Sequence, residues 1–268
     1  MSSNPIPENE LLVPFETRNL PGEYKEYYLA KRQNLFASIQ RFSETFNCYM
    51  LLDQIWYREF QDIKVAGDPD RMFPLILYIN AHAKIRVSME LALSGCLAEA
   101  RSILRDGIEC VAHAHHMLGD PNLQVKWLSK NDEQSTFKEA FEKNKKTVLF
   151  HGLDELHKSY GELSETGSHA TINAMCDRFV RVEDGKKVEW RLHYCGTEPR
   201  LWGMQLFWML LTCFTMEQTL FRDYESRLKF DDALLRMRAE FENRKEQLRK
   251  DLIVRYNVPP PDARVVSP

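Results

Sequence analysis

One long apolar segment constrains the fold of this chain more than any other feature. It runs from Leu201 to Met216 with the sequence LWGMQLFWMLLTCFTM, contains Gln205, and is followed directly by Glu217. A helix needs about 20 apolar residues to cross a bilayer, and this segment is too short to do so. We therefore expect a buried central helix of a helical bundle, and no membrane span.

The composition also favours long helices. The 268 residues include 11 glycines and 12 prolines, and this share of about 9% is below the average of about 12%. Apolar residues make up 44% of the chain, which is enough for a sizeable core and excludes disorder as the main description. The net charge of −3 excludes a global field that attracts nucleic acid or anionic lipid, although a local basic patch is compatible with it.

Cysteine usage and the N-terminal sequence favour a cytoplasmic protein. The six cysteines form no CxxC pair and no zinc-ligand spacing, so reduced thiols are the simplest interpretation. The first residues, MSSNPIPENELLVPFE, have neither the basic nor the apolar region of a signal peptide. The sequence has no P-loop, dinucleotide fingerprint, HExxH or EF-hand pattern, so we expect no cofactor.

Helical periodicity begins after a proline-rich N-terminus. A helix or a broken helix pair is predicted from Glu23 to about Lys64, because one stripe of it is apolar. The members of this stripe are Leu35, Ile39, Phe42, Phe46 and Tyr49. The run AGDPDRMFP ends this element, and we place Pro74 at the first position of the next helix, which extends to about Ser94.

A seven-residue repeat marks the following helix, from Leu97 to Leu118. Its apolar positions are Leu97, Leu104, Val111 and Leu118, which predicts a packing seam. Weaker helical patterns occupy about 122–130, 134–149 and 153–165. The amphipathic stretch from Phe230 to Tyr256 mixes seven basic with six acidic residues, which is typical of a dimerisation or packing helix.

One segment departs from helical periodicity. Residues 179–193 form two alternating runs around Asp184-Gly185, which is a strong hairpin signal. We therefore predict an all-α fold, a helical bundle with an inserted β-hairpin near 179–193. The expected organisation is an extended arm at 1–22, one helical domain at 23–257 and a flexible proline-rich tail at 258–268. A hairpin needs support from the bundle or a partner, so we expect Trp190 to contact a partner.

The seam helix also carries a polar arc. Asp106, Glu109, His113 and His116 fall within about 80°, so they are weak candidates for a metal site, while His115 points elsewhere. Bundle metal centres use a Glu-x-x-His pair from each of two helices, whereas the spacing here is Glu-x-x-x-His with no second copy. The same arc also fits a polar pocket, or a solvated ladder of Arg105, Glu109 and His113.

A second candidate site is the turn from Tyr160 to His169. Gly161 and Gly167 bracket a polar segment that ends in His169, and histidine suits general acid or base chemistry near neutral pH. An alternative is a helix terminus in which Ser168 or Thr171 provides the cap and His169 hydrogen-bonds a carbonyl group. Because no GxSxG motif occurs, a hydrolase triad has little support.

These two segments carry a family resemblance. The sequence LAEARSILRDGIE at 97–109, followed by YGELSxxGSH at 160–169, resembles a mostly bacterial all-helical domain of unknown function, which is similar to the HEPN superfamily. Members of that superfamily are helical bundles, often dimeric, and include RNases of toxin and antiviral defence systems. The resemblance implies a shared cluster of Arg105, Glu109 and His169 with Ser164 nearby. No arginine here precedes a histidine by the HEPN spacing of four to six residues.

The function that we expect is a non-catalytic binding or regulatory protein, and the resemblance implies a place in a defence or toxin-type system. Its polar pocket would consist of Arg105, Glu109, His113 and His169, with Ser164, Tyr160 and Trp190 as further binding residues. Two enzyme alternatives remain open. One is a metal-independent RNase in which His113 or His169 is the general base and Arg105 stabilises the developing phosphorane charge. The other is a metal-dependent hydrolase. A homodimer or another protein partner is expected, and RNA is compatible with the RNase alternative.

Overall fold

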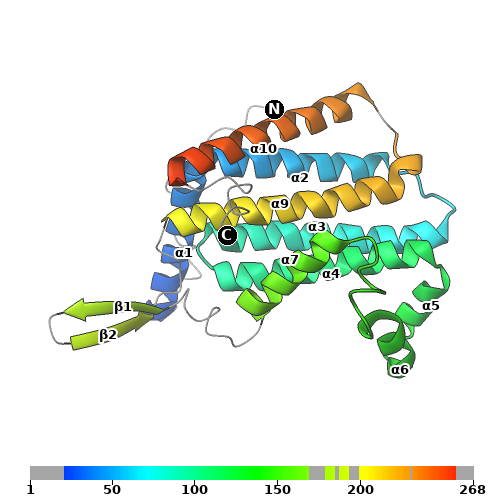
Figure 1. Cartoon of the computed structure of the whole chain (residues 1–268), viewed down its shortest axis with the longest axis horizontal. Helices are drawn as coiled ribbons and strands as arrows, with labels where there is room; N and C mark the ends of the chain where they lie inside the picture. Colours follow the sequence, from blue (N-terminus) through cyan, green and yellow to red (C-terminus); the bar gives the residue numbers. More distant parts are fainter. Residues whose placement is uncertain (1–20, 169–178, 185–186, 193–198, 230, 258–268) are drawn as a thin grey trace, which may run out of the picture.

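The computed structural model describes residues 21–168, 179–184, 187–192, 199–229 and 231–257 (Figure 1). The body of the chain is an all-α bundle, as the periodicity predicts. The helices are α1 (Gly22–Arg41), α2 (Ser43–Asp62), α3 (Pro69–Leu93), α4 (Leu97–Gly119), α5 (Asn122–Leu128), α6 (Gln134–Phe137), α7 (Asp154–Leu163), α9 (Pro199–Tyr224) and α10 (Asp232–Tyr256). Short π-helical turns follow α6 and α7, at Lys138–Glu142 and Ser164–Ser168. The predicted arm up to residue 20 and the tail from residue 258 lie outside the described residues.

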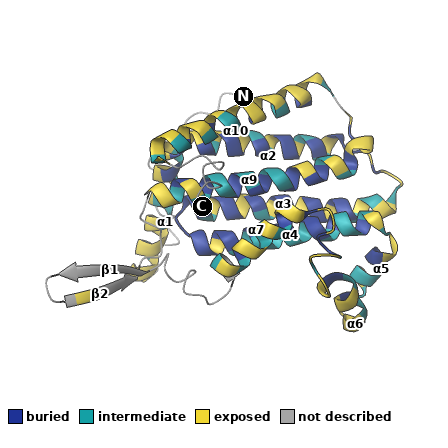
Figure 2. Ribbon diagram, viewed as in Figure 1, coloured by how far each residue is buried: buried dark blue, intermediate teal, exposed yellow. Residues whose placement is uncertain are grey.

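The long helices lie side by side (Figure 1). The α3–α4 pair has the most extensive contact, α9 packs on α2, α3 and α4, and α10 covers α2. The shorter α7 crosses the outer side of α4, while α1 runs across one end of the bundle. This arrangement buries one stripe of each long helix (Figure 2) and leaves one face of α4 beneath α7.

The predicted central helix and seam are confirmed. In α9, one side is fully buried by Leu206, Met209, Leu210, Cys213, Met216 and Leu220. In α4, Leu97, Leu104 and Val111 are buried, and Leu118 packs against the core. No helix within the described part of the chain is both long and apolar enough to span a membrane. The four cysteines in that part, at 48, 96, 110 and 213, are unbridged.

The start of α3 corrects one prediction. The helix begins at Pro69, and Pro74 lies inside it. A proline within a helix removes the N–H that would bond to the carbonyl four residues earlier, which here belongs to Asp70. Gln124 of α5 donates its side-chain N–H to that carbonyl over 2.6 Å. This tertiary hydrogen bond supplies a donor for the carbonyl that Pro74 leaves without an intrahelical partner.

The stretch from Phe230 to Tyr256 is a packing helix. Leu234, Phe241, Leu248 and Leu252 of α10 are buried. On the same helix, Arg238 pairs with Glu59 of α2 (2.5 Å) and with Glu217 of α9. Both carboxylates are almost fully buried, so one guanidinium joins three helices inside the bundle.

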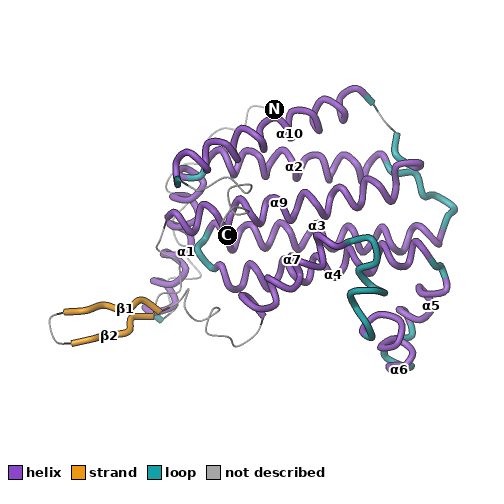
Figure 3. Tube along the Cα trace, in the orientation of Figure 1, coloured by secondary structure: helices purple, strands orange, loops and turns teal. Residues whose placement is uncertain are grey.

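Two short strands also lie within the described residues (Figure 3). β1 (Phe179–Asp184) and β2 (Lys187–Leu192) pair antiparallel, with Phe179 opposite Leu192 and Asp184 opposite Lys187. The strand pair projects beyond the end of the bundle near α1 (Figure 1).

Candidate functional site

A polar cluster forms where α7 crosses α4, and Arg105 lies at its centre. The Arg105 guanidinium donates from Nε to Ser164 Oγ (3.0 Å) and from Nη2 to the Tyr160 hydroxyl (2.8 Å). Its Nη1 lies 3.2 Å from Asp106 Oδ1. The side chain of Arg105 is 22% exposed. The cluster is therefore half-buried, and it joins the two candidate segments that the sequence placed 55 residues apart.

Lys145 completes this cluster, and the sequence analysis missed it. Its ammonium group donates to Glu109 Oε1 over 2.9 Å and to the Tyr160 hydroxyl over 3.3 Å. Arg105 and Lys145 therefore meet at one phenol oxygen. Both cations also lie near the Tyr160 ring, at 4.8 and 5.4 Å from its centroid, within the range of cation–π attraction. We refer to Arg105, Glu109, Lys145, Tyr160 and Ser164 as the polar cluster.

Local helix geometry positions the members of the cluster. Arg105 and Glu109 are four residues apart on α4 and share one face. Tyr160 and Ser164 are four apart on α7 and the π-helical turn that follows it. Ser164 donates its hydroxyl proton to the Tyr160 carbonyl oxygen over 2.7 Å, so its oxygen is oriented to accept from Arg105.

The ion pair in the cluster stays charged near neutral pH. Partial burial acts to raise the pKa of Glu109, but the hydrogen bond and charge of Lys145 outweigh burial and hold that pKa below its usual value. Burial likewise acts to lower the pKa of Lys145, and Glu109 reverses the effect, so the pKa lies above its usual value. The predicted ladder along α4 is not the arrangement found, because Arg105 turns to α7.

His113 does not join the polar cluster, contrary to prediction. Trp127 donates its indole N–H to His113 Nδ1 over 2.9 Å, and the imidazole packs against Phe137 and Phe141. Burial in this aromatic surrounding lowers the pKa of His113 to about 4. At neutral pH His113 is thus a neutral acceptor that is already paired.

The weak metal candidates do not converge either. Asp106 pairs with Arg105 and lies 3.8 Å from Lys84, and Glu109 pairs with Lys145. His116 meets the edge of Phe141. Within the described residues, no three His, Cys, Asp or Glu side chains have the geometry of a metal site. Asp106, Glu109, His113 and His116 are therefore not brought together as one ligand set.

The remaining predicted residues have different outcomes. His115 points away from the arc, as predicted, and its Nδ1 lies 2.9 Å from Asp223 on α9. His169 lies outside the described residues, as does the side chain of Trp190. The sequence analysis also missed Arg101, one turn before Arg105, which is buried and reaches the Thr166 carbonyl at 3.5 Å.

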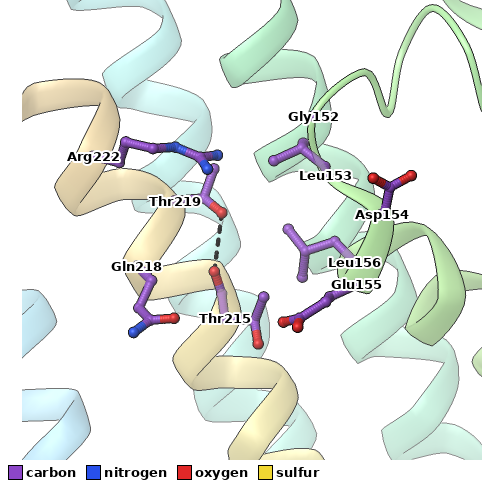
Figure 4. A pocket seen from close by; sticks show the side chains of 9 residues that line it. All are labelled: Gly152, Leu153, Asp154, Glu155, Leu156, Thr215, Gln218, Thr219 and Arg222. Carbon is purple, nitrogen blue, oxygen red and sulfur yellow. Dashed lines mark hydrogen bonds between the residues drawn. The ribbon is translucent and has the colours of Figure 1, made fainter.

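A separate cavity of about 260 Å³ lies between the start of α7 and α9 (Figure 4). Its lining residues are Gly152, Leu153, Asp154, Glu155, Leu156, Thr215, Gln218, Thr219 and Arg222. The Thr219 hydroxyl donates to the Thr215 carbonyl (2.9 Å). None of the predicted site residues lines this cavity, so it is distinct from the polar cluster.

Comparisons with protein-family models, curated protein sequences and solved structures gave no match for this chain. The resemblance to HEPN-like proteins therefore stays a prediction from short sequence segments.

Proposed function

We propose that this chain is a non-catalytic, cytoplasmic binding or regulatory protein that recognises an anionic group of its partner at the polar cluster. The observation that carries the proposal is the meeting of Arg105 and Lys145 at the hydroxyl of Tyr160. Both cations are about a quarter exposed, so an approaching anion can reach them.

Charge and donor capacity support an anionic ligand. Three cations, Arg105, Lys145 and Lys84, face the carboxylates of Asp106 and Glu109, which leaves an excess of positive charge. Among the described residues, Arg105 uses three of its five N–H donors and Lys145 uses two of three. The remaining donors suit a phosphate or carboxylate.

The titration behaviour favours binding over catalysis. A general acid or base works best with a pKa near the working pH. The pKa of His113 falls to about 4, that of Glu109 is lowered, and that of Lys145 is raised. All three shifts move away from neutrality. The RNase alternative consequently depends on His169, whose position the structure does not describe.

A calorimetric titration with pyrophosphate, used as an anionic probe, tests the proposal. We expect saturable binding to the wild-type protein that weakens about tenfold or more in Arg105→Gln and Lys145→Gln, because each removes hydrogen bonds to a charged group. The matched control Lys146→Gln changes an exposed neighbour and should bind like the wild type. Equal binding by Arg105→Gln, or no binding to the wild type, would contradict the proposal.

A parallel incubation with labelled RNA tests the enzyme alternative. The binding proposal predicts intact RNA. Cleavage that His169→Ala abolishes would instead support a HEPN-like RNase.

We also propose that the hairpin at 179–193, with Trp190, contacts the partner, because the strand pair projects beyond the bundle (Figure 1).

A further inference from the structure

The cavity between α7 and α9 combines charged, hydroxyl and apolar side chains in its lining. On α9, Thr215, Thr219 and Arg222 follow at spacings of four and three residues, which places them on one face of the helix. Arg222 reaches from α9 toward Leu153, and Glu155 reaches back from α7 toward Thr215 (Figure 4). A guanidinium and a carboxylate therefore lie at different ends of one cavity.

Neither of these two charges is matched within the described part of the chain. Arg222 has no ion pair or side-chain hydrogen bond there. The carboxylate next to it in sequence, that of Asp223, accepts from the Tyr78 hydroxyl over 2.5 Å and lies 2.9 Å from His115 Nδ1. Glu155 has no ion-pair partner among the described residues either. Both side chains are exposed, so a ligand can reach them from solvent.

The size and floor of the cavity suit a small molecule with an apolar middle. Leu153 and Leu156 are buried and form the apolar part of the lining. The volume of about 260 Å³ equals that of roughly nine water molecules at about 30 Å³ each, so a ligand of about that many non-hydrogen atoms fits. Arg222 and Glu155 do not pair with each other across the cavity. A ligand that meets both must therefore carry its own two charges apart.

We propose that this cavity binds a small ω-amino acid, a linear zwitterion whose carboxylate pairs with Arg222 and whose ammonium group pairs with Glu155. Its methylene chain lies along Leu153 and Leu156. A guanidinium binds a carboxylate through two parallel N–H donors. Thr215 donates its hydroxyl proton to the carbonyl one turn earlier on α9, over 3.1 Å, so its oxygen remains an acceptor for the ammonium group beside Glu155.

Calorimetric titration of the full chain with 6-aminohexanoate, a linear zwitterion of this size, tests the proposal. We expect saturable binding that is about tenfold or more weaker for hexanoate and for hexylamine, because each lacks one of the two charges. Norleucine, an isomer of the probe whose two charges are adjacent, should also bind about tenfold or more weakly. A wild-type protein that does not bind 6-aminohexanoate, or that binds hexanoate equally well, would overturn the proposal.

Substitutions on the two walls locate the site. Arg222→Gln and Glu155→Gln should each weaken the binding of 6-aminohexanoate about tenfold or more, and Arg222→Lys, which keeps the charge, should bind it more tightly than Arg222→Gln. The controls Arg236→Gln on α10 and Glu162→Gln on α7 change exposed side chains of the same kinds and should bind like the wild type. Unchanged binding by either Arg222→Gln or Glu155→Gln would overturn the proposal.

Discussion

The buried triad of Arg238, Glu59 and Glu217 and the polar cluster both hold basic side chains at helix contacts, and they differ in how far their charges are matched. In the buried triad, Arg238 lies between Glu59 and Glu217. Burial, together with the charge of Glu217, raises the pKa of Glu59 to about 10. Burial raises the pKa of Glu217 as well, so the two carboxyl groups share a proton beside one guanidinium.

The polar cluster has the opposite balance. It is partly open to solvent, its cations exceed its carboxylates, and Glu109 is ionised because Lys145 lowers its pKa. A buried group whose charges are balanced holds helices together. A partly exposed group with unused hydrogen-bond donors can also bind a ligand. This difference supports a structural role for the triad and the proposed anion-binding role of the cluster.

Removal of the cation from the triad should have the largest effect. Arg238→Met leaves Glu217 buried without a counter-charge, and we expect a loss of about 3–5 kcal/mol in the free energy of unfolding. Urea denaturation measures this loss, with the exposed neighbour Arg236→Met as control. A loss below about 1 kcal/mol would show that the triad does not depend on its arginine.

The two glutamates should respond to pH in opposite directions. The folded-state pKa of Glu59 is raised above its unfolded value of about 4.5. The contribution of Glu59 to the free energy of unfolding is therefore complete below pH 4.5 and declines as the pH rises toward 10. Glu59→Gln should thus gain stability relative to the wild type between pH 5 and 9, by at most about 1.4 kcal/mol per pH unit. Denaturation midpoints across this range check the prediction; a constant difference would contradict it.

For Glu109 the sign reverses. Its folded-state pKa is lowered, so its contribution is present above the unfolded pKa and is lost as the pH falls through the folded pKa. The difference in unfolding free energy between Glu109→Gln and the wild type should be constant from pH 6 to 9 and shrink below about pH 4.5. A difference that grows with rising pH would place Glu109 in the same class as Glu59.

The smallest effect should come from the hydroxyl in the polar cluster. Tyr160→Phe removes one oxygen that accepts from both Arg105 and Lys145. Because water can reach both cations, we expect the free energy of unfolding to fall by about 1 kcal/mol or less. Tyr57→Phe, at an exposed position, is the control for thermal unfolding. A loss as large as that of Arg238→Met would mean that the cluster is a structural core element.

Much of the fold follows from sequence periodicity. The apolar run in α9 and the seven-residue repeat in α4 predict buried faces because helix geometry alone determines which residues share a face. The start of α3 could not be predicted this way. Both Pro69 and Pro74 suit a first turn, and the donor that satisfies the Asp70 carbonyl belongs to Gln124, 54 residues further along the chain.

The candidate site was predictable in part. Arg105 and Glu109 share a face by spacing, and Tyr160 and Ser164 lie in a segment with a distinctive turn pattern. Their meeting depends on how α7 crosses α4, which no local pattern encodes. Lys145 sits in a lysine run, Lys143 to Lys146 with Asn144, whose members look alike in sequence. The position of His113 was predicted wrongly, because the aromatic residues that surround it come from another segment of the chain.

The most direct test of the central claim follows the side-chain Nε–H resonances of the arginines by NMR while pyrophosphate is added to the full-length protein. If the polar cluster binds anions, the Arg105 resonance should shift in a saturable manner, and the resonance of Arg238 in the buried triad should stay unchanged. The contrary result is an Arg105 resonance that does not move, or one that moves only as much as those of the exposed arginines.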